Sequence, residues 1–264
     1  MKKTLLALAA VVAMTGSASA ADLAARPYVK APMPAPVANW TGFYIFGGGG
    51  GGIWSANGGV DSTATGACII CTNTRTGGDG WFGTVGAGYD WQSAAWVFGI
   101  FGDGTFGSLK GNIGDAGIAP LGIVGTTKME TAWAAGARVG YLVAPNVLSY
   151  VNAGYTGTYW SGSTLLFNGS VTPSGIHTDS FNRGGAFVGG GVENSLNIFG
   201  LSAPGWFMKT EYRLAYLENK NVSEKVDGTN VLVGRDINFK PLVQTISTSL
   251  VYRFNWGGPV VAKY

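Results

Sequence analysis

Four stretches of this chain alternate mostly large apolar residues with mostly small or polar ones, in a period of two. Between residues 81 and 91 the odd positions include Trp81, Val85, Ala87, Tyr89 and Trp91, whereas the even positions are mostly glycine, threonine or aspartate. The same period recurs over residues 129–143, 206–216 and 242–254. Because successive side chains of a β-strand point to opposite faces, these stretches predict strands with one apolar face each.

Extending the pattern along the chain gives eight candidate strands. They lie at about 40–54, 80–91, 96–106, 128–143, 148–160, 181–193, 206–217 and 242–255. Each supplies the roughly 9–11 residues that a tilted strand needs to cross a bilayer.

The connections between these strands alternate in length. Residues 92–95 and 144–147 form tight turns and residues 194–205 a connection of middling length, whereas residues 55–79, 107–127, 161–180 and 218–241 form long loops. Short turns on one side and long loops on the other are typical of outer-membrane barrels. The sequence therefore predicts an all-β fold: an eight-stranded antiparallel up-and-down transmembrane β-barrel with short periplasmic turns and long extracellular loops.

The N-terminus carries an export signal. Lys2 and Lys3 precede an apolar run over residues 4–14, and Ala18, Ser19 and Ala20 form a small-residue cleavage site. This pattern predicts a signal peptide over 1–20, cleaved after Ala20. A proline-rich leader at 21–39 would follow, as a periplasmic tether that reaches the cell wall or as a disordered segment. The barrel would occupy 40–256 and a C-terminal tail 257–264.

Loss of Lys2 and Lys3 with the signal peptide lowers the formal net charge from +3 to +1. A nearly neutral chain without basic runs lacks the electrostatic footprint of a nucleic-acid-binding protein. Charged residues make up 12% of the chain, about half the usual share. This low share argues against the alternative of a soluble β-sandwich, because its solvent-exposed face would be unusually poor in charge.

The polar faces of the predicted strands would therefore line the lumen of the barrel. They hold nine charged residues of both signs: Asp103, Lys128, Glu130, Arg138, Glu193, Lys209, Glu211, Arg213 and Arg253. Aromatic residues near the strand ends would form a periplasmic girdle on the outside, at Trp40, Trp91, Trp96, Trp206 and Trp256. In one interpretation the lumen charges pair and plug the barrel, and in the other they line a path for small ions. Eight-stranded interiors are usually filled by side chains, which favours the plug.

Three further patterns have structural interpretations. The CxxC pair Cys68 and Cys71 predicts a disulfide in the first long loop, since neither a redox helix nor further zinc ligands accompany it. His177 lies beside Asp179 and Ser180 in the third long loop, where such residues more often solvate a loop than catalyse a reaction. The run 47–52, six glycines, lacks the lysine and helix of a phosphate-binding loop and favours close strand packing.

Three short segments resemble a known family: residues 39–44 (NWTGFY), 209–212 (KTEY) and 251–254 (VYRF). In order and spacing they are similar to the alphaproteobacterial outer-membrane immunogenic proteins, a porin-family β-barrel group related to the OmpA transmembrane barrel. The resemblance implies an eight-stranded barrel with surface-exposed loops and a structural or porin-like role. Members often end in an aromatic residue that the assembly machinery reads, for which Phe254 and Tyr264 are both candidates here.

The expected function is thus structural, in the cell outer membrane, with display of loops at the surface. A narrow porin-like channel for small ions or solutes is the alternative, followed by a lipid acyl-transfer enzyme and a soluble ligand-binding barrel. The expected partners are outer-membrane lipid and lipopolysaccharide, the barrel-assembly machinery, and the cell wall through the leader. No catalytic residue, cofactor or metal is expected.

Overall fold

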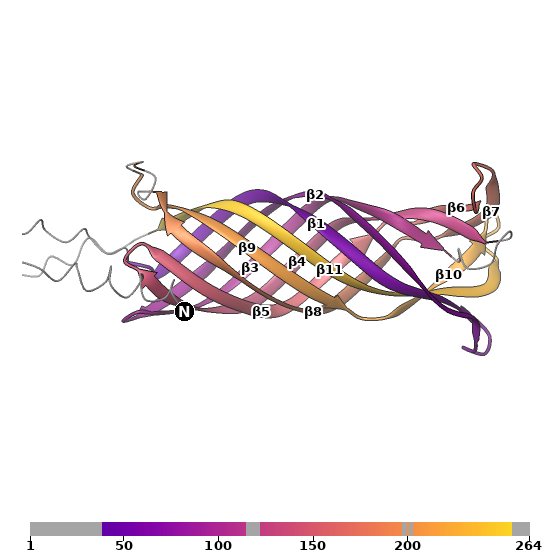
Figure 1. Ribbon diagram of the computed structural model, residues 1–264, viewed down its shortest axis with the longest axis horizontal. Coiled ribbons are helices and arrows are strands. Elements are labelled where there is room, and N and C mark those ends of the chain that lie inside the picture. Colours follow the sequence, from indigo (N-terminus) through magenta and orange to yellow (C-terminus); the bar gives the residue numbers. More distant parts are fainter. Residues whose placement is uncertain (1–38, 115–121, 197–199, 201–202, 255–264) are drawn as a thin grey trace, which may run out of the picture. The chain divides into compact units, whose positions relative to one another are not determined.

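The computed structural model describes residues 39–114, 122–196, 200 and 203–254. The predicted signal peptide, nearly all of the predicted leader, Trp256 and the predicted C-terminal tail lie outside this range. The regular elements of the described part are antiparallel strands (Figure 1). They are β1 (Gly42–Ser62), β2 (Cys68–Ser93), β3 (Trp96–Gly114), β4 (Ile123–Ala144), β5 (Val147–Trp160), β6 (Ser163–Phe167), β7 (Pro173–Thr178), β8 (Phe181–Ser195), β9 (Trp206–Leu217), β10 (Lys220–Val226) and β11 (Leu232–Phe254). No helix in this part is long and apolar enough to cross a bilayer.

Eight of these strands close a barrel in the order β1-β2-β3-β4-β5-β8-β9-β11, with β11 paired back to β1. The predicted eight-stranded antiparallel barrel is confirmed. The register can be followed around the wall along directly paired residues. From Trp206 the row passes Tyr252, Ile45, Ala87, Gly102, Ala135, Tyr155 and Ala186 and returns to β9 at Tyr216.

This row returns to β9 ten residues further along the strand than where it started. This offset is the shear of the barrel, which is therefore 10. Eight strands with that stagger tilt by about 40° and enclose a barrel of about 8 Å radius. The strands in Figure 1 run oblique to the barrel axis, as this requires. An interior of this size is just wide enough for side chains to fill.

The outer wall carries an apolar band between two levels of aromatic rings. On β2, Trp81 and Trp91 are 80% and 49% exposed and lie ten residues apart. At about 3.3 Å per residue and a tilt of about 40°, they are separated by about 25 Å along the axis, the height of the apolar band of outer-membrane barrels. Trp96 and Trp206 are also exposed near the periplasmic level, as predicted.

Beyond Trp81 the strands continue past the membrane, and the apolar residues of the alternating pattern now face the lumen instead of the outside. On β1, Trp54, Ala56 and Val60 are buried inside the barrel, whereas Asn57 is exposed. Apolar residues therefore point inward and polar residues outward, as in a soluble barrel, because the outer face now meets water. The inward residues form an apolar cluster that includes Trp54, Trp160, Phe181, Ile237 and Phe239.

This continuation corrects the prediction of four long loops. The extracellular connection between β1 and β2 covers residues 63–67, and that between β10 and β11 covers residues 227–231. Residues 161–180 and 218–241 contain the short strands β6, β7 and β10 and the start of β11. The loops were predicted too long because the sequence pattern of a lipid-facing strand ends where the outer face of the strand meets water.

At the extracellular end, the short strands β6, β7 and β10 take the places of β5, β8 and β9 in the wall of the barrel (Figure 1). There β4 pairs with β6, β6 with β7, β7 with β10, and β10 with β11. Together with β1, β2 and β3 they again give eight strands around the barrel. Two-residue breaks at 161–162, 179–180 and 218–219 separate β5, β8 and β9 from the short strands β6, β7 and β10.

The glycine run lies within β1 and brings it close to β11. A β-carbon on Gly48 would lie 2.5 Å from the Cα of Ser249, and one on Gly50 would meet the carbonyl oxygen of Ile246. Those two glycines share the inward face with Phe46. Close strand packing therefore accounts for the glycines at these positions.

Candidate functional site in the barrel lumen

The periplasmic half of the lumen holds a closed ring of four charged side chains, which we call the lower network: Asp90, Arg138, Glu193 and Arg253. Arg138 donates to Asp90 Oδ2 at 2.5 Å and to Glu193 Oε2 at 3.0 Å. Arg253 donates to the same two carboxylates, at 2.8 Å and 2.7 Å. All four are almost fully buried. Each carboxylate thus lies between two guanidinium groups, which meets the requirement that buried charges be paired.

Aromatic rings enclose the lower network from the periplasmic side. The ring of Tyr44 lies 4.5 Å from the guanidinium carbon of Arg138 and 4.9 Å from that of Arg253. The ring of Trp40 lies 4.5 Å from the guanidinium carbon of Arg253. The Nη1 of Arg253 also donates a hydrogen bond to the backbone carbonyl of Trp40, at 3.0 Å. The indole of Trp40 also packs against Phe207, with ring centroids 4.9 Å apart.

The placement of Trp40 in the outer girdle is therefore wrong. Its side chain is 0% exposed and fills the periplasmic mouth of the lumen. Trp40 precedes the first residue of β1, so the alternation of that strand does not govern its direction. Its backbone N–H instead donates to the side-chain oxygen of Gln92 at 2.9 Å.

A second group of charges, the upper network, lies nearer the extracellular side: Asp103, Lys209, Glu211 and Arg213. Arg213 binds both oxygens of Asp103, at 3.0 Å and 2.6 Å, and its Nε pairs with Glu211. Lys209 lies 3.9 Å from Glu211 and 3.4 Å from the ring centre of Phe46. The three charged residues of β9 occupy alternate positions, so all of them point into the lumen.

Two polar residues of β5 bind Glu211 of the upper network, and one of them, Tyr150, also contacts the lower network. Tyr150 donates its hydroxyl hydrogen to Glu211 at 2.7 Å, and Asn152 donates to the same oxygen at 2.8 Å. The ring of Tyr150 lies 5.1 Å from the guanidinium carbon of Arg138. Each network contains two cations and two anions, so the column that they form is neutral.

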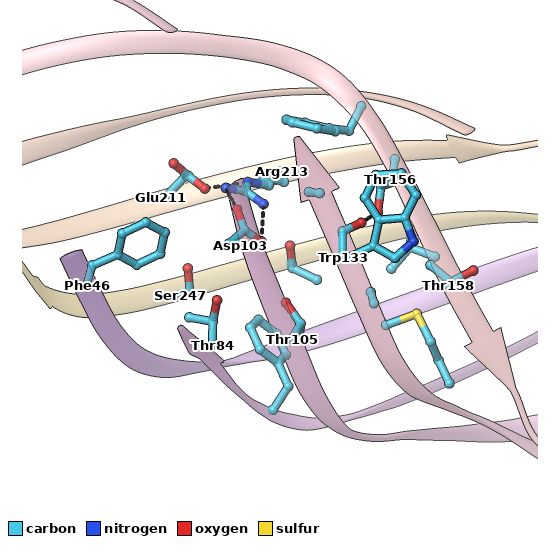
Figure 2. Close-up of a pocket in the computed structure, with 18 of the residues that line it drawn as sticks. Phe46, Thr84, Asp103, Thr105, Trp133, Thr156, Thr158, Glu211, Arg213 and Ser247 are labelled. Carbon is cyan, nitrogen blue, oxygen red and sulfur yellow. Dashed lines mark hydrogen bonds and ion pairs between the residues drawn. The ribbon is translucent and has the colours of Figure 1, made fainter. Parts of the chain in front are cut away.

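A cavity of about 60 Å³ lies above the upper network (Figure 2). Its wall carries hydroxyl groups of Thr84, Thr105, Thr156, Thr158 and Ser247. This volume and these polar partners suit a few ordered waters. On the extracellular side, Trp54, Trp160 and Phe239 pack edge to face with centroids 5.1–5.5 Å apart.

The structure brings seven of the nine predicted lumen residues into the two networks. Lys128 and Glu130 lie elsewhere: they pair with each other at 2.6 Å, with side chains 42% and 35% exposed. The pairing of β4 with β5 shifts register between Met129 and Thr131, and Met129 is buried in the apolar cluster. This bulge turns the neighbours of Met129 to the outer wall, so the assignment of these two residues to the lumen is wrong.

The sequence reasoning did not select Asp90, although the signal was present. Asp90 is an even position of β2, on the face opposite to Tyr89 and Trp91, and its side chain is fully buried. Tyr44 and Tyr150 were not selected either, because a tyrosine on a strand fits either face. Their alternation with Phe43 and Val151, which are exposed, points them inward.

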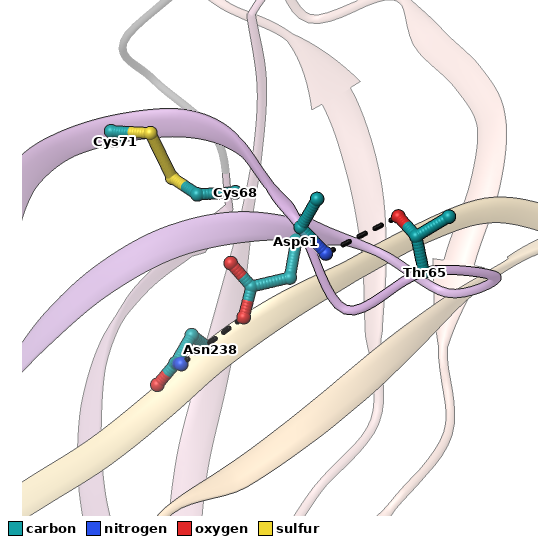
Figure 3. The surroundings of a disulfide bond; sticks show 6 residues. Asp61, Thr65, Cys68, Cys71 and Asn238 are labelled. Atoms are coloured by element: carbon teal, nitrogen blue, oxygen red, sulfur yellow. Dashed lines mark hydrogen bonds between the residues drawn. A yellow bond between two sulfur atoms is a disulfide. The ribbon is translucent and has the colours of Figure 1, made fainter.

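Cys68 and Cys71 form a disulfide near the extracellular end of β2, with Cα atoms 5.6 Å apart (Figure 3). They lie within a strand, not in the predicted loop. Gly58 pairs with Thr74 but Val60 pairs with Ile70, so the disulfide bridges a bulge in β2. On β1, the partner of Cys68 is Asp61, which accepts a hydrogen bond from Asn238 at 3.4 Å.

His177 lies on β7, where its Nδ1 is 2.7 Å from Asp227 and its Nε2 is 3.7 Å from Asp179. The described residues contain no group of three His, Cys, Asp or Glu side chains that is arranged to hold a metal ion.

Comparisons with known proteins agree with this architecture. A family model described as "outer membrane protein beta-barrel domain" matches residues 6–254. The 31 kDa outer-membrane immunogenic proteins of Brucella melitensis biotype 1 and Brucella suis biovar 1 are each 28% identical over 259 residues, covering 96% of this chain and 100% of the relative. The crystal structure of the outer membrane protein OprG from Pseudomonas aeruginosa has a similar fold. Its TM-score is 0.55 at 9% identity, covering 83% of this chain and 100% of that one.

Proposed function

Because this chain belongs to the outer membrane β-barrel domain family and lies in the outer membrane, we propose that it stabilises the envelope as a closed barrel and displays its extracellular end. The observation that carries the proposal is the column of paired charges, which joins side chains from β2, β3, β4, β5, β8, β9 and β11 across the lumen. Side chains that hold one another across so narrow an interior support a rigid, sealed wall.

The energetics of the networks favour this role over transport. Removing one partner of a buried ion pair typically costs about 3–5 kcal/mol, because the other charge remains buried without compensation. A path for ions would require several such pairs to separate together. The aromatic cluster on the extracellular side would add a second, apolar barrier.

The second candidate function is a narrow channel. The cavity between the upper network and the aromatic cluster supports it, because its hydroxyl-lined wall would offer hydrogen bonds to water and small solutes. This candidate requires both barriers around the cavity to open.

An enzymatic role has less support. Among the described residues, the ring of His177 is held by Asp227 and Asp179, and no serine hydroxyl lies within hydrogen-bond distance of it. A nucleophile activated by histidine needs that contact.

The expected partners follow from the position of the chain in the membrane. The exposed aromatic rings would meet outer-membrane lipid and lipopolysaccharide. Phe254, the last residue of β11 and 37% exposed, is the candidate signal for the assembly machinery within the described range. Tyr264 and the leader, with its proposed contact to the cell wall, lie outside that range.

Deletion of the gene, followed by complementation, tests the proposal. A structural role predicts that the deletion strain becomes sensitive to detergent. The wild type should restore resistance, whereas Arg138→Met, which leaves the buried carboxylates of Asp90 and Glu193 short of one partner, should restore it only in part. A deletion strain that resists detergent normally but takes up small solutes more slowly would favour the channel instead.

A further inference from the structure

Above the membrane, the regular pairing of β4 is interrupted where its partner changes from β5 to β6. Strands β4 and β6 pair at Ile123 with Phe167 and at Val124 with Leu166, and β4 next pairs with β5 at Met129. Between these points a cleft of about 430 Å³ opens on the outside of the wall. That volume is in the range of small-molecule binding sites.

The cleft is lined by uncharged polar side chains. Asn112, Thr126, Thr164, Asn168 and Ser170 contribute amide and hydroxyl groups, and none of its described lining residues carries a charge. Asn112 and Thr126 are direct partners on β3 and β4, and both are exposed. Within the described part of the chain, the side chains of Asn112, Thr126 and Asn168 make no hydrogen bond and remain available to a ligand.

One aromatic ring borders these polar groups. Phe167, at the end of β6, is 40% exposed and lines the same cleft. An exposed ring next to amides and hydroxyls fits a ligand that has an apolar face as well as many hydroxyl groups. An asparagine amide offers a donor and an acceptor together, which matches a pair of neighbouring hydroxyl groups.

The position of the cleft fits the same class of ligand. Thr126 lies seven residues beyond Trp133, an exposed ring of the extracellular girdle on β4. That separation corresponds to about 17 Å along the axis of a barrel with this tilt. At that height the wall is surrounded by the sugars of the outer leaflet and not by its acyl chains.

We propose that this cleft, bordered by Phe167, Asn112, Thr126 and Asn168, binds a neutral saccharide. The ring of Phe167 packs against the face of a pyranose, and the amides and hydroxyls bind its hydroxyl groups. The ligand is either an oligosaccharide of the lipopolysaccharide beside the barrel or a free glycan at the cell surface. The site does not depend on whether the lumen conducts.

Binding of neutral oligosaccharides to the refolded full-length protein in detergent micelles tests the proposal. Calorimetric titration would use uncharged oligosaccharides released from the lipopolysaccharide of the same envelope, and an array of unrelated neutral glycans. Phe167→Ala and Asn112→Ala should each weaken binding at least tenfold. Val171→Ala is the matched control, because Val171 is 91% exposed on the same turn and does not line the cleft; binding should not change.

A heat-dependent mobility shift would show that each variant is folded. Binding of the envelope's own oligosaccharide alone would identify a contact with neighbouring lipid, whereas binding of unrelated glycans would identify a free ligand; both support the site. Three results would overturn the proposal. They are the absence of neutral saccharide binding, binding restricted to anionic glycans, and binding that survives both cleft substitutions.

Discussion

Tyr150 donates its hydroxyl hydrogen to Glu211 at 2.7 Å and so connects the two charge networks of the lumen. Glu211 also accepts a hydrogen bond from Asn152 and forms ion pairs with Lys209 and Arg213. Tyr150 is 4% exposed, and its ring lies 5.1 Å from Arg138 of the lower network. One side chain on β5 therefore contacts charged groups on β4 and β9.

Tyr150→Phe should lower the free energy of unfolding by about 1.5–3 kcal/mol, the usual contribution of a hydrogen bond to a charged group. Denaturant unfolding of the protein in lipid vesicles measures this change. Tyr141→Phe is the control, since Tyr141 lies on the outer wall and is 46% exposed. Equal stability of the two variants would argue against a connection between the networks.

Arg138→Met should destabilise the barrel far more than Lys128→Met, although both remove one cation from β4. Arg138 neutralises two fully buried carboxylates, Asp90 and Glu193, and its loss should cost about 3–5 kcal/mol. Lys128 pairs on the outer wall with Glu130, where such pairs contribute at most about 1 kcal/mol. The same unfolding experiment measures both variants. A loss for Lys128→Met as large as that for Arg138→Met would place its ion pair in the lumen after all.

Gly48→Ala should impair folding of the barrel, whereas Gly47→Ala should not. A β-carbon at Gly48 would press into the backbone of β11 at Ser249, but one at Gly47 would make an ordinary contact of 3.8 Å with Val85. The fraction of refolded protein, read from the heat-dependent shift on a gel, should fall severalfold for the first substitution. Normal refolding of Gly48→Ala would show that β1 and β11 are less tightly paired.

The double variant Cys68→Ser/Cys71→Ser should keep the transmembrane barrel intact and loosen the extracellular end of β2. The disulfide spans a bulge beyond the aromatic girdle, where neighbouring strands pair irregularly. Limited proteolysis of intact cells should therefore cleave the variant near residues 68–74 and leave the wild type uncut there. Loss of the heat-dependent shift would instead show that the bond supports the whole barrel.

The membrane-spanning part of the barrel could be predicted from the sequence because every strand there follows the same alternation of lipid-facing and lumen-facing residues. Between Trp81 and Trp91, lipid outside and a filled lumen inside impose one pattern on every strand, so the strand order and seven network residues were predicted. Past Trp81 the outer face meets water and the pattern inverts, so Ile113 and Phe239 were assigned to loops although they belong to strands.

Local irregularities account for the remaining errors. The bulge beside Met129 reverses the faces of Lys128 and Glu130, and no feature of the sequence marks it. The position of Trp40 depends on Arg253, Phe207 and Gln92, which are distant in the chain. By contrast, the alternation that placed Asp103 in the lumen also predicts that Asp90 points into it, so this residue could have been predicted from the sequence.

Single-channel recording in planar bilayers tests most directly the proposal that the lumen is closed. If the lumen is closed, correctly inserted wild-type protein, verified by its heat-dependent mobility shift, should give no stepwise current. Arg213→Ala, which removes the partner of Asp103 and Glu211 at the floor of the cavity, is recorded in parallel. Steady conductance steps from the wild type that change in size with Arg213→Ala would contradict the account and establish the lumen as a pore.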